Sequence, residues 1–367
     1  MSFPSLKIGD IVARIPIVQG GMGVGISLSG LASAVANEGG IGVIAGAMIG
    51  MSEPDVGKNP HEANIRAMRK EIRKARELSD GVLGVNIMVA LTNFADLVKT
   101  SIEEKVDVIF SGAGLPLDMP KYLKEYYEDK KEQAHTKLVP IVSSARAATI
   151  LCKKWLSKFD YLPDAFVVEG PKAGGHLGFS REELDDPSHS LEVVIPQVVE
   201  AVKVFEEKHG KKIPVIAAGG VYTGEDIKKF LDMGASGVQM GTRFVATHEC
   251  DADDRFKQSY IDAKEEDVTI IQSPVGMPGR AIIGQFVEDA RAGLKKPFKC
   301  IFECIHNCKK EESPYCIASA LLNAKKGNLD RGFAFSGSNV HRIDRIMSVK
   351  ELMTSLATEF DAASARA

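Results

Sequence analysis

The sequence lacks several short motifs that mark common enzyme classes. It contains no H-E-x-x-H, no G-x-S-x-G and no G-x-x-x-x-G-K-[ST], so it gives no support to a metalloprotease-type zinc site, a serine hydrolase or a P-loop. The glycine-rich stretch at residues 19–30, QGGMGVGISLSG, also misses the dinucleotide fingerprint G-x-G-x-x-G, because Ile26 or Leu28 stands where the third glycine is required. A Rossmann-type dinucleotide site is therefore not expected.

One-sided charge and long apolar runs are also missing. Basic and acidic residues are interspersed and the net charge is -3, which indicates neither a nucleic-acid partner nor an anionic membrane surface. No apolar run is long enough to span a bilayer, and the opening MSFPSLKIGDIVARIP has no charged-then-apolar signal segment. We therefore expect a cytoplasmic protein with no membrane partner. The sequence leaves open whether it forms a homodimer.

What the chain does have is a recurring apolar run that ends in glycine or a small polar residue. Such runs, apolar on both faces, are typical of buried parallel strands, and amphipathic segments at residues 61–78, 191–209 and 224–233 separate some of them. This alternation predicts an α/β fold, a (β/α)8 TIM barrel, with a doubly wound open sheet as the alternative. The eight expected strands are residues 16–21, 41–46, 81–88, 106–112, 138–144, 164–170, 213–220 and 237–244.

The pattern changes after about residue 251, where charged and irregular segments follow. We predict that residues 1–285 form the barrel and that residues 286–367 form a C-terminal extension packed on it. The extension carries four of the six cysteines, namely Cys300, Cys304, Cys308 and Cys316. Such crowding in a cytosolic protein favours metal or redox chemistry over structural disulfides.

The spacing of these cysteines, C-x3-C-x3-C-x7-C, matches neither the common zinc-finger pattern nor the ferredoxin pattern. On a helix, the first three would share one face. Four thiolates suit a [4Fe-4S] cluster, which we name as the candidate metal site. Zinc and unligated thiols that pack as small apolar residues remain alternatives.

Two glycine loops predict a phosphate site. Gly219 and Gly220 end the seventh expected strand, and Gly241 and Thr242 lie within the eighth, where TIM barrels often bind phosphate. An oxyanion approaches a peptide N–H closely where no Cβ intervenes, and the helix expected to begin near Thr223 adds a favourable dipole. Either loop alone also fits an ordinary turn; the pair favours phosphate.

The sixth expected strand leads into VVEGPKAGGHLGF at residues 167–179, where a single imidazole, His176, stands among glycines. A histidine after a strand is commonly a surface residue. Here the glycines indicate that the backbone lies close to a ligand, and an unperturbed histidine pKa suits proton transfer near neutral pH.

Several of these segments together resemble the nitronate monooxygenase family, formerly called 2-nitropropane dioxygenases, which also includes flavin-dependent enoyl-ACP reductases and some NAD(P)H:quinone reductases. The resemblance covers about residues 10–285. It is carried by PIVQGGMG, GVNIM, EGPKAGGHLGF, IPVIAAGGV, GASGVQMGTRF and SPVGMPGRAI.

The resemblance implies bound FMN and assigns roles to residues that match the family motifs. The residues it places near the flavin ring are Gly20, Gly21, Met22, Asn86, Gly174 and Gly175. Ser143 and Lys172 are placed at the border of the cofactor or substrate space. The residues it places on the phosphate are Gly219, Gly220, Gly241 and Thr242. His176 matches the active-site histidine. Many relatives have an acidic residue where this chain has Lys172.

The function that follows is oxidation of an alkyl nitronate by an FMN-dependent oxidoreductase, with His176 as base. One alternative is an enzyme that uses NAD(P)H to reduce an enoyl thioester or a quinone. Another, of a different class, is a flavin-free barrel that binds a phosphorylated metabolite. An iron–sulfur cluster, if present, favours a reductase.

Overall fold

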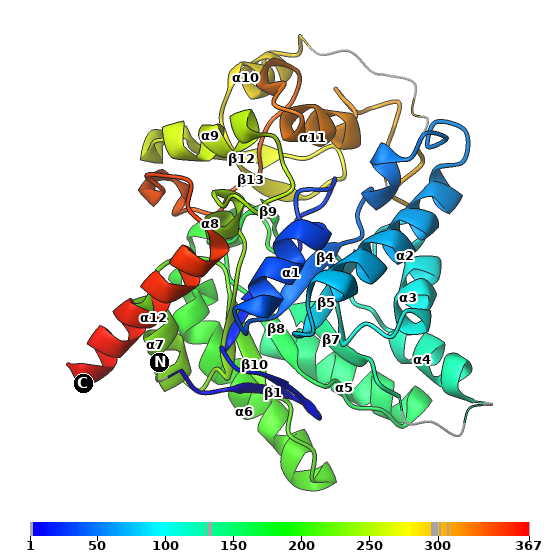
Figure 1. Ribbon diagram of the computed structural model, residues 1–367, viewed down its shortest axis with the longest axis vertical. Coiled ribbons are helices and arrows are strands. Elements are labelled where there is room, and N and C mark those ends of the chain that lie inside the picture. The colour runs from blue at the N-terminus through cyan, green and yellow to red at the C-terminus, as the bar shows by residue number, and fades with distance from the viewer. Residues whose placement is uncertain are drawn as a thin grey trace.

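The computed structural model describes residues 3–128, 130, 134–294, 300, 302–306 and 308–366. Its central feature is an eight-stranded parallel sheet in the order β3-β11-β10-β8-β7-β6-β5-β4. A parallel bridge between Val18 and Ile41 joins the two edge strands, so the sheet closes into the predicted (β/α)8 barrel (Figure 1). The strands are β3 (Ile17–Gln19), β4 (Gly42–Ala45), β5 (Leu83–Met88), β6 (Val108–Gly112), β7 (Lys137–Val142), β8 (Phe166–Glu169), β10 (Val215–Ala218) and β11 (Gly237–Met240).

Apolar side chains fill the barrel, and an N-terminal hairpin plugs one end. The hairpin consists of β1 (Leu6–Ile8) and β2 (Ile11–Ala13), paired antiparallel around a turn at Gly9, whose φ of 62° favours glycine. Leu6 and Ile8 pack in one cluster with inward-facing strand residues such as Phe110. In Figure 1 the hairpin lies at the lower end of the barrel, which leaves the opposite end for the site.

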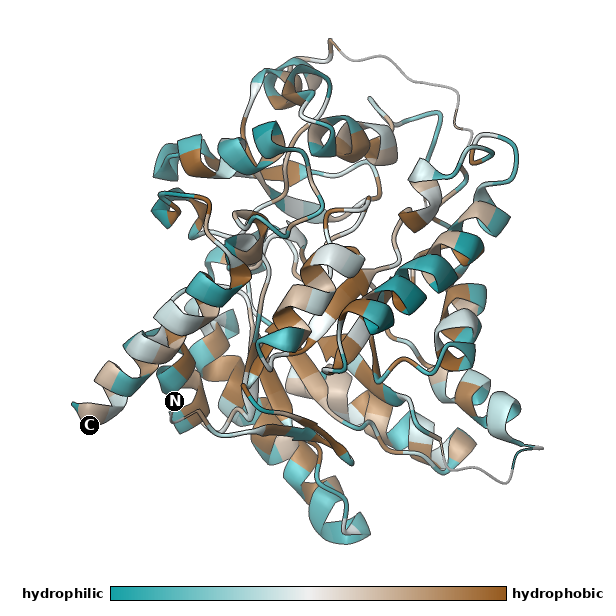
Figure 2. Cartoon of the chain, viewed as in Figure 1, coloured by the Kyte–Doolittle hydropathy of each residue, from teal (hydrophilic) through white to brown (hydrophobic). Residues whose placement is uncertain are grey.

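Amphipathic helices surround the strands, as their sequence periodicity predicts. Figure 2 shows the strands largely hydrophobic and the outer helix faces hydrophilic. The predicted segments at residues 61–78, 191–209 and 224–233 are helical. The surrounding helices are α1 (Ser29–Asn37), α2 (Pro60–Leu78), α3 (Phe94–Glu103), α4 (Met119–Tyr127), α5 (Ala145–Phe159), α6 (Leu191–His209) and α7 (Gly224–Asp232). Among the described residues, no helix is both long and apolar enough to cross a bilayer.

The helix ring is completed from the far end of the sequence. The helix after the last barrel strand, α8 (Thr242–Val245), is a single turn, and α12 (Val349–Ala365) packs against α7 and α1 instead. The contact is close: a Cβ on Gly224 would lie 2.2 Å from the carbonyl oxygen of Leu356, so only glycine fits there. The domain boundary at residue 285 stays a prediction. The packing of α12 shows that the C-terminal part of the chain contacts the barrel helices.

A second sheet lies over the carboxyl ends of the barrel strands. It has the order β12-β13-β9, with β9 (Gly175–His176), β12 (Val268–Gln272) and β13 (Pro278–Ile282). The helices nearby are α9 (Asp254–Asp262), α10 (Gln285–Arg291) and α11 (Ile317–Lys325) (Figure 1). Short 3-10 turns are η1 (Ile49–Ser52), η2 (Glu182–Asp185), η3 (Pro187–His189), η4 (Glu265–Asp267), η5 (Leu329–Arg331) and η6 (Val340–Arg342).

Candidate active site

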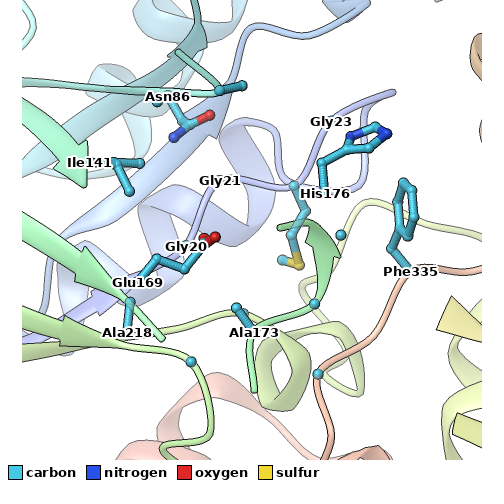
Figure 3. Close-up of a pocket in the computed structure, with 18 of the residues that line it drawn as sticks. Gly20, Gly21, Gly23, Asn86, Ile141, Glu169, Ala173, His176, Ala218 and Phe335 are labelled. Carbon is cyan, nitrogen blue, oxygen red and sulfur yellow. The ribbon is translucent and has the colours of Figure 1, made fainter. Parts of the chain in front are cut away.

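A cavity of about 610 Å³ opens at the carboxyl ends of the barrel strands, within the size range of small-molecule and cofactor sites (Figure 3). Barrel loops form one part of its wall, and segments from residue 256 onward form the rest. All thirteen residues predicted for the flavin site border this one cavity. They are Gly20, Gly21, Met22, Asn86, Ser143, Lys172, Gly174, Gly175, His176, Gly219, Gly220, Gly241 and Thr242. The structure thus brings the set together, while the individual roles stay predictions.

His176 is held by a strand pairing that sequence motifs did not indicate. Its strand, β9, pairs antiparallel with β13, so Gly279 lies opposite His176. The His176 Nε2 atom lies 2.8 Å from the Ser273 hydroxyl, and the Phe335 ring packs edge-on with its centroid 5.0 Å from the imidazole centroid. Burial lowers the pKa of His176 to about 4. The imidazole is therefore neutral at pH 7.

The same segment clamps the glycine loop below the histidine. The Arg280 guanidinium donates a hydrogen bond of 2.7 Å to the carbonyl of Ala173 and another to the carbonyl of Pro171. These bonds cross more than 100 residues of sequence, so the SPVGMPGRAI motif at residues 273–282 holds the loop that carries the histidine. Ser273, from this motif, is a site residue that the sequence analysis missed.

On the other side of the cavity, the backbone of Gly20 and Gly21 lines the wall with no side chain in between. A Cβ on Gly21 would lie 2.4 Å from the Cβ of Asn86, so glycine lets the loop pass directly beside that side chain. The buried Gln19 fixes the loop by donating to the Gly20 carbonyl at 2.6 Å and accepting from the Val43 N–H at 2.9 Å. Flat backbone of this kind suits contact with a planar ring.

The two predicted phosphate loops lie side by side at the ends of β10 and β11, which pair in the sheet. Gly219 and Gly220 have φ values of 95° and 91°, and their N–H groups donate to no acceptor in the described residues. A Cβ on Gly241 would meet only the Met22 sulfur, at 3.9 Å, so open space lies beside this residue. Free N–H groups beside open space fit a phosphate.

The expected contribution of the α7 helix dipole is wrong. Asp226 accepts hydrogen bonds from the N–H groups of Tyr222 and Thr223, both at 2.9 Å, and Glu359 of α12 accepts one from Gly224 at 2.7 Å. Two carboxylates therefore already occupy the N-terminus of α7. The N-terminus of α7 is therefore not free to hold a phosphate, and the glycine loops remain.

The sequence analysis also missed Glu169, the last residue of β8, which Figure 3 shows on the cavity floor near Gly20 and Ala218. No group in the described residues makes a hydrogen bond or ion pair to its carboxyl. Burial raises the pKa of Glu169 to about 7, although its side chain touches the cavity space. Its place just before GPKAGGH was the only sequence signal.

The cysteine segment does not form the predicted metal site. Among the described residues, which include all four cysteines, no group of three or more His, Cys, Asp or Glu side chains is arranged to hold a metal ion. The described residues of 300–308 form no helix, so the even spacing produces no common face. Neither the [4Fe-4S] prediction nor the zinc alternative gains support.

Two of these cysteines instead pack as apolar groups. Cys304 and Cys316 lie against the cluster of Val24, Met48 and Ala318. The pKa of Cys304 is raised to about 12, mainly by burial and to a smaller extent by the nearby Cys316, so this thiol stays protonated. Cys304 also borders the cavity, where it contributes apolar wall.

Comparison with known proteins agrees with this site. A model of the nitronate monooxygenase family matches residues 5–359. The chain therefore belongs to the nitronate monooxygenase family, and it is an enzyme, a flavin-dependent oxidoreductase that acts on small molecules.

Individual relatives cover most of the chain. A probable nitronate monooxygenase of Bacillus subtilis is 26% identical, with 94% of this chain and 95% of that one aligned. A second relative, from Mycobacterium tuberculosis, is 30% identical over an alignment that covers 76% of this chain and 66% of that relative's length. Its name is (3aS,4S,5R,7aS)-5-hydroxy-7a-methyl-1-oxo-octahydro-1H-indene-4-carboxyl-CoA dehydrogenase.

Solved structures show the same fold. The structure of FabK from Thermotoga maritima superposes with a TM-score of 0.72 at 30% identity, covering 96% of this chain and 95% of that one. Nitroalkane oxidase from Streptomyces ansochromogenes, at 22% identity, has a TM-score of 0.73 over 96% and 98% of the two chains. This second likeness supports the fold alone.

Proposed function

We propose that the protein is an FMN-dependent oxidoreductase that oxidises alkyl nitronates, with His176 as the active-site base. The observation that carries the proposal is a neutral, partly buried imidazole in the same cavity as two glycine loops whose N–H groups have no acceptor among the described residues. The family resemblance adds the flavin. FMN, when bound, supplies the two-electron acceptor that an oxidation requires.

The protein's own part is to hold the cofactor and to move a proton. The loops at Gly219 and Gly241 would receive the phosphate, while Gly20, Gly21 and Gly175 would lie against the ring. A Cβ on Gly175 would meet no atom within 4 Å, so the space beside it is free for a ring. The residues present therefore fit the group.

Ser273 sets which role the imidazole plays. If His176 Nε2–H donates to the Ser273 oxygen, Nδ1 is left unprotonated and accepts the α-carbon proton of a neutral nitroalkane, which becomes the nitronate that is then oxidised. If the Ser273 hydroxyl donates to Nε2, Nδ1–H is left to donate to an anionic nitronate or enolate. No described residue bonds to Nδ1. Lys172, exposed at the cavity rim, adds a positive charge that favours such anions.

The second candidate is reduction of an enoyl thioester, or of a quinone, with NAD(P)H. The 30% identity to FabK over nearly the whole length favours it, as does the similarity to a dehydrogenase of a carboxyl-CoA compound. A pKa near 4 does not separate the two candidates, because at pH 7 it leaves little imidazolium to donate a proton and also makes the neutral imidazole a weak base. The flavin-free barrel remains a third candidate with only generic phosphate geometry behind it.

Anaerobic stopped-flow spectroscopy separates these candidates. The flavin-loaded protein is mixed with an alkyl nitronate, with NADH or with NADPH, and bleaching of the flavin absorbance is followed. Rapid bleaching by nitronate supports the proposal. Rapid bleaching by NAD(P)H, with no response to nitronate, overturns it in favour of the reductase. Protein that takes up no FMN overturns both.

A further inference from the structure

A tetrapeptide of the C-terminal region, Ser336 to Asn339, lies directly on the two phosphate loops. The Gly337 N–H donates to the Thr242 hydroxyl oxygen at 2.9 Å, and the Asn339 side-chain amide donates to the Gly220 carbonyl at 2.8 Å. The Ser338 N–H donates to the Lys172 carbonyl at 3.2 Å. One short segment thus touches the loops after β8, β10 and β11, and it borders the same cavity.

Glycines on both sides allow this close approach. A Cβ on Gly174 would lie 2.5 Å from the Ser336 carbonyl carbon, and a Cβ on Gly337 would lie 3.0 Å from the Thr242 hydroxyl oxygen. These distances leave no room for side chains at the two glycines, so the segment is closely packed against the loops and forms part of the cavity wall.

The segment contains two hydroxyl groups that have no hydrogen-bond partner within the described residues. In the described part of the chain, the buried side-chain atoms without a hydrogen-bond partner are the hydroxyls of Ser29, Ser336 and Ser338 and the Nδ1 of His341. Ser336 is 2% exposed. A buried hydroxyl without a partner is unfavourable, so two of them in one cavity wall indicate a ligand that supplies acceptors.

Neutral donors surround the same place. The Thr242 hydroxyl oxygen already accepts from Gly337, which leaves its own proton free to donate, and the N–H groups of Gly219 and Gly220 are free as well. Hydroxyl and amide donors that converge on one space match the several oxygens of a phosphate, which accept strong charge-assisted hydrogen bonds.

We propose that Ser336 and Ser338 donate hydrogen bonds to the phosphate of FMN, so that residues 336–339 form the third wall of the phosphate site. This inference rests on the proposed function, because it takes FMN to be the ligand of the cavity. It has a consequence for assembly: the cofactor's phosphate joins the barrel loops to a segment that follows them by about 95 residues.

The test compares FMN with riboflavin, which has the same ring system and no phosphate. Apoprotein is prepared for the wild type, Ser336→Ala, Ser338→Ala and the double variant, and each dissociation constant is measured by flavin fluorescence quenching. Ser29→Ala is the matched control, since it removes a buried, unpartnered hydroxyl that does not border the cavity. Thermal unfolding of each apoprotein is measured with and without FMN.

Each serine variant should bind FMN about 10-fold more weakly and the double variant about 100-fold, while riboflavin binding changes less than about 2-fold. The apoproteins should be as heat-stable as the wild type or more so, because an unsatisfied hydroxyl is removed. The rise in Tm on adding FMN should shrink. Ser29→Ala should leave both dissociation constants unchanged.

Three outcomes overturn the inference. If the wild type binds FMN and the variants bind it equally well, the serines do not contact phosphate, and the proposed function stands. If the variants lose FMN and riboflavin to the same degree, the serines shape the cavity instead. If the wild type binds neither flavin, the proposed function fails and the inference falls with it.

Discussion

The phosphate loops and the cysteine segment border the same cavity, and both drew predictions from the sequence, yet the structure treats them differently. It leaves the N–H groups of Gly219 and Gly220 without acceptors among the described residues, and it leaves open space beside Gly241. At Cys304 and Cys316 it packs the thiols against apolar neighbours, and no metal-binding group forms in the described residues.

The difference lies in which atoms make the site. A glycine loop offers main-chain groups, whose position follows once the strand before the loop is placed in the barrel. A metal site needs three or four side chains that converge within bonding distance, and spacing along an irregular segment does not determine that. Sequence spacing is therefore more informative at strand ends than in the cysteine segment.

Filling the phosphate loops should have the largest effect. Gly241→Val should weaken FMN binding at least about 100-fold, roughly 2.7 kcal/mol, because the valine side chain takes the open space beside Gly241. Gly57→Val is the control, since a Cβ on Gly57 meets no atom within 4 Å and Gly57 lies outside the cavity. Flavin titration decides the matter: equal binding by the two variants contradicts the location of the phosphate site.

Removing the imidazole should separate chemistry from binding. His176→Asn should lower kcat about 10²- to 10⁴-fold with any substrate that requires proton transfer, while FMN binding changes little. Steady-state kinetics and flavin titration on the same preparation measure the two effects. A variant that keeps wild-type turnover would show that His176 is not the base.

A smaller effect should follow from the positioning residue. Ser273→Ala removes the 2.8 Å bond to His176 and should lower kcat about 10-fold, with a shift in the pH profile. In the wild type, the decline in activity caused by protonation of His176 should be centred near pH 4, because burial lowers the pKa of His176. Protonation of His176 should therefore not reduce activity between pH 7 and pH 5.5. Ser273→Thr should restore most of the activity; a pH profile identical in all three proteins argues against the assignment.

The carboxyl on the cavity floor gives a test through stability. The pKa of Glu169 is raised from 4.5 to about 7 in the folded protein, so between these values the folded state holds a proton that the unfolded state has lost. Its contribution to stability is therefore present below pH 4.5 and lost as the pH rises to 7. Relative to the wild type, Glu169→Gln should gain Tm on going from pH 5 to pH 8. A constant Tm difference across that range contradicts the shift.

The smallest effect is expected in the cysteine segment. Cys308→Ser should change FMN affinity less than about 3-fold, because Cys308 does not border the cavity. Iron and zinc content, measured on protein purified without oxygen, should not depend on this substitution. A stoichiometric metal that disappears with Cys308→Ser would restore the metal prediction and reverse the comparison with the phosphate loops.

Much of the barrel was predictable because its strands lie in short, mostly apolar runs, several of which end in glycine or a small polar residue. What escaped prediction depends on contacts between distant segments. Ser273 reaches His176 across 97 residues, and Gly337 reaches Thr242 across 95. Glu169 looked like an ordinary strand residue until its burial and its missing partner were visible.

By itself the sequence determined the order of strands and the glycine loops at their ends, because local hydropathy and the absence of a Cβ act on neighbouring residues. Only the tertiary structure decided that β13 holds the histidine, that carboxylates occupy the start of α7, and that the segment at 336–339, which contacts the phosphate loops, carries two serine hydroxyls with no partner among the described residues. Those outcomes depend on which groups meet in space once the barrel has closed.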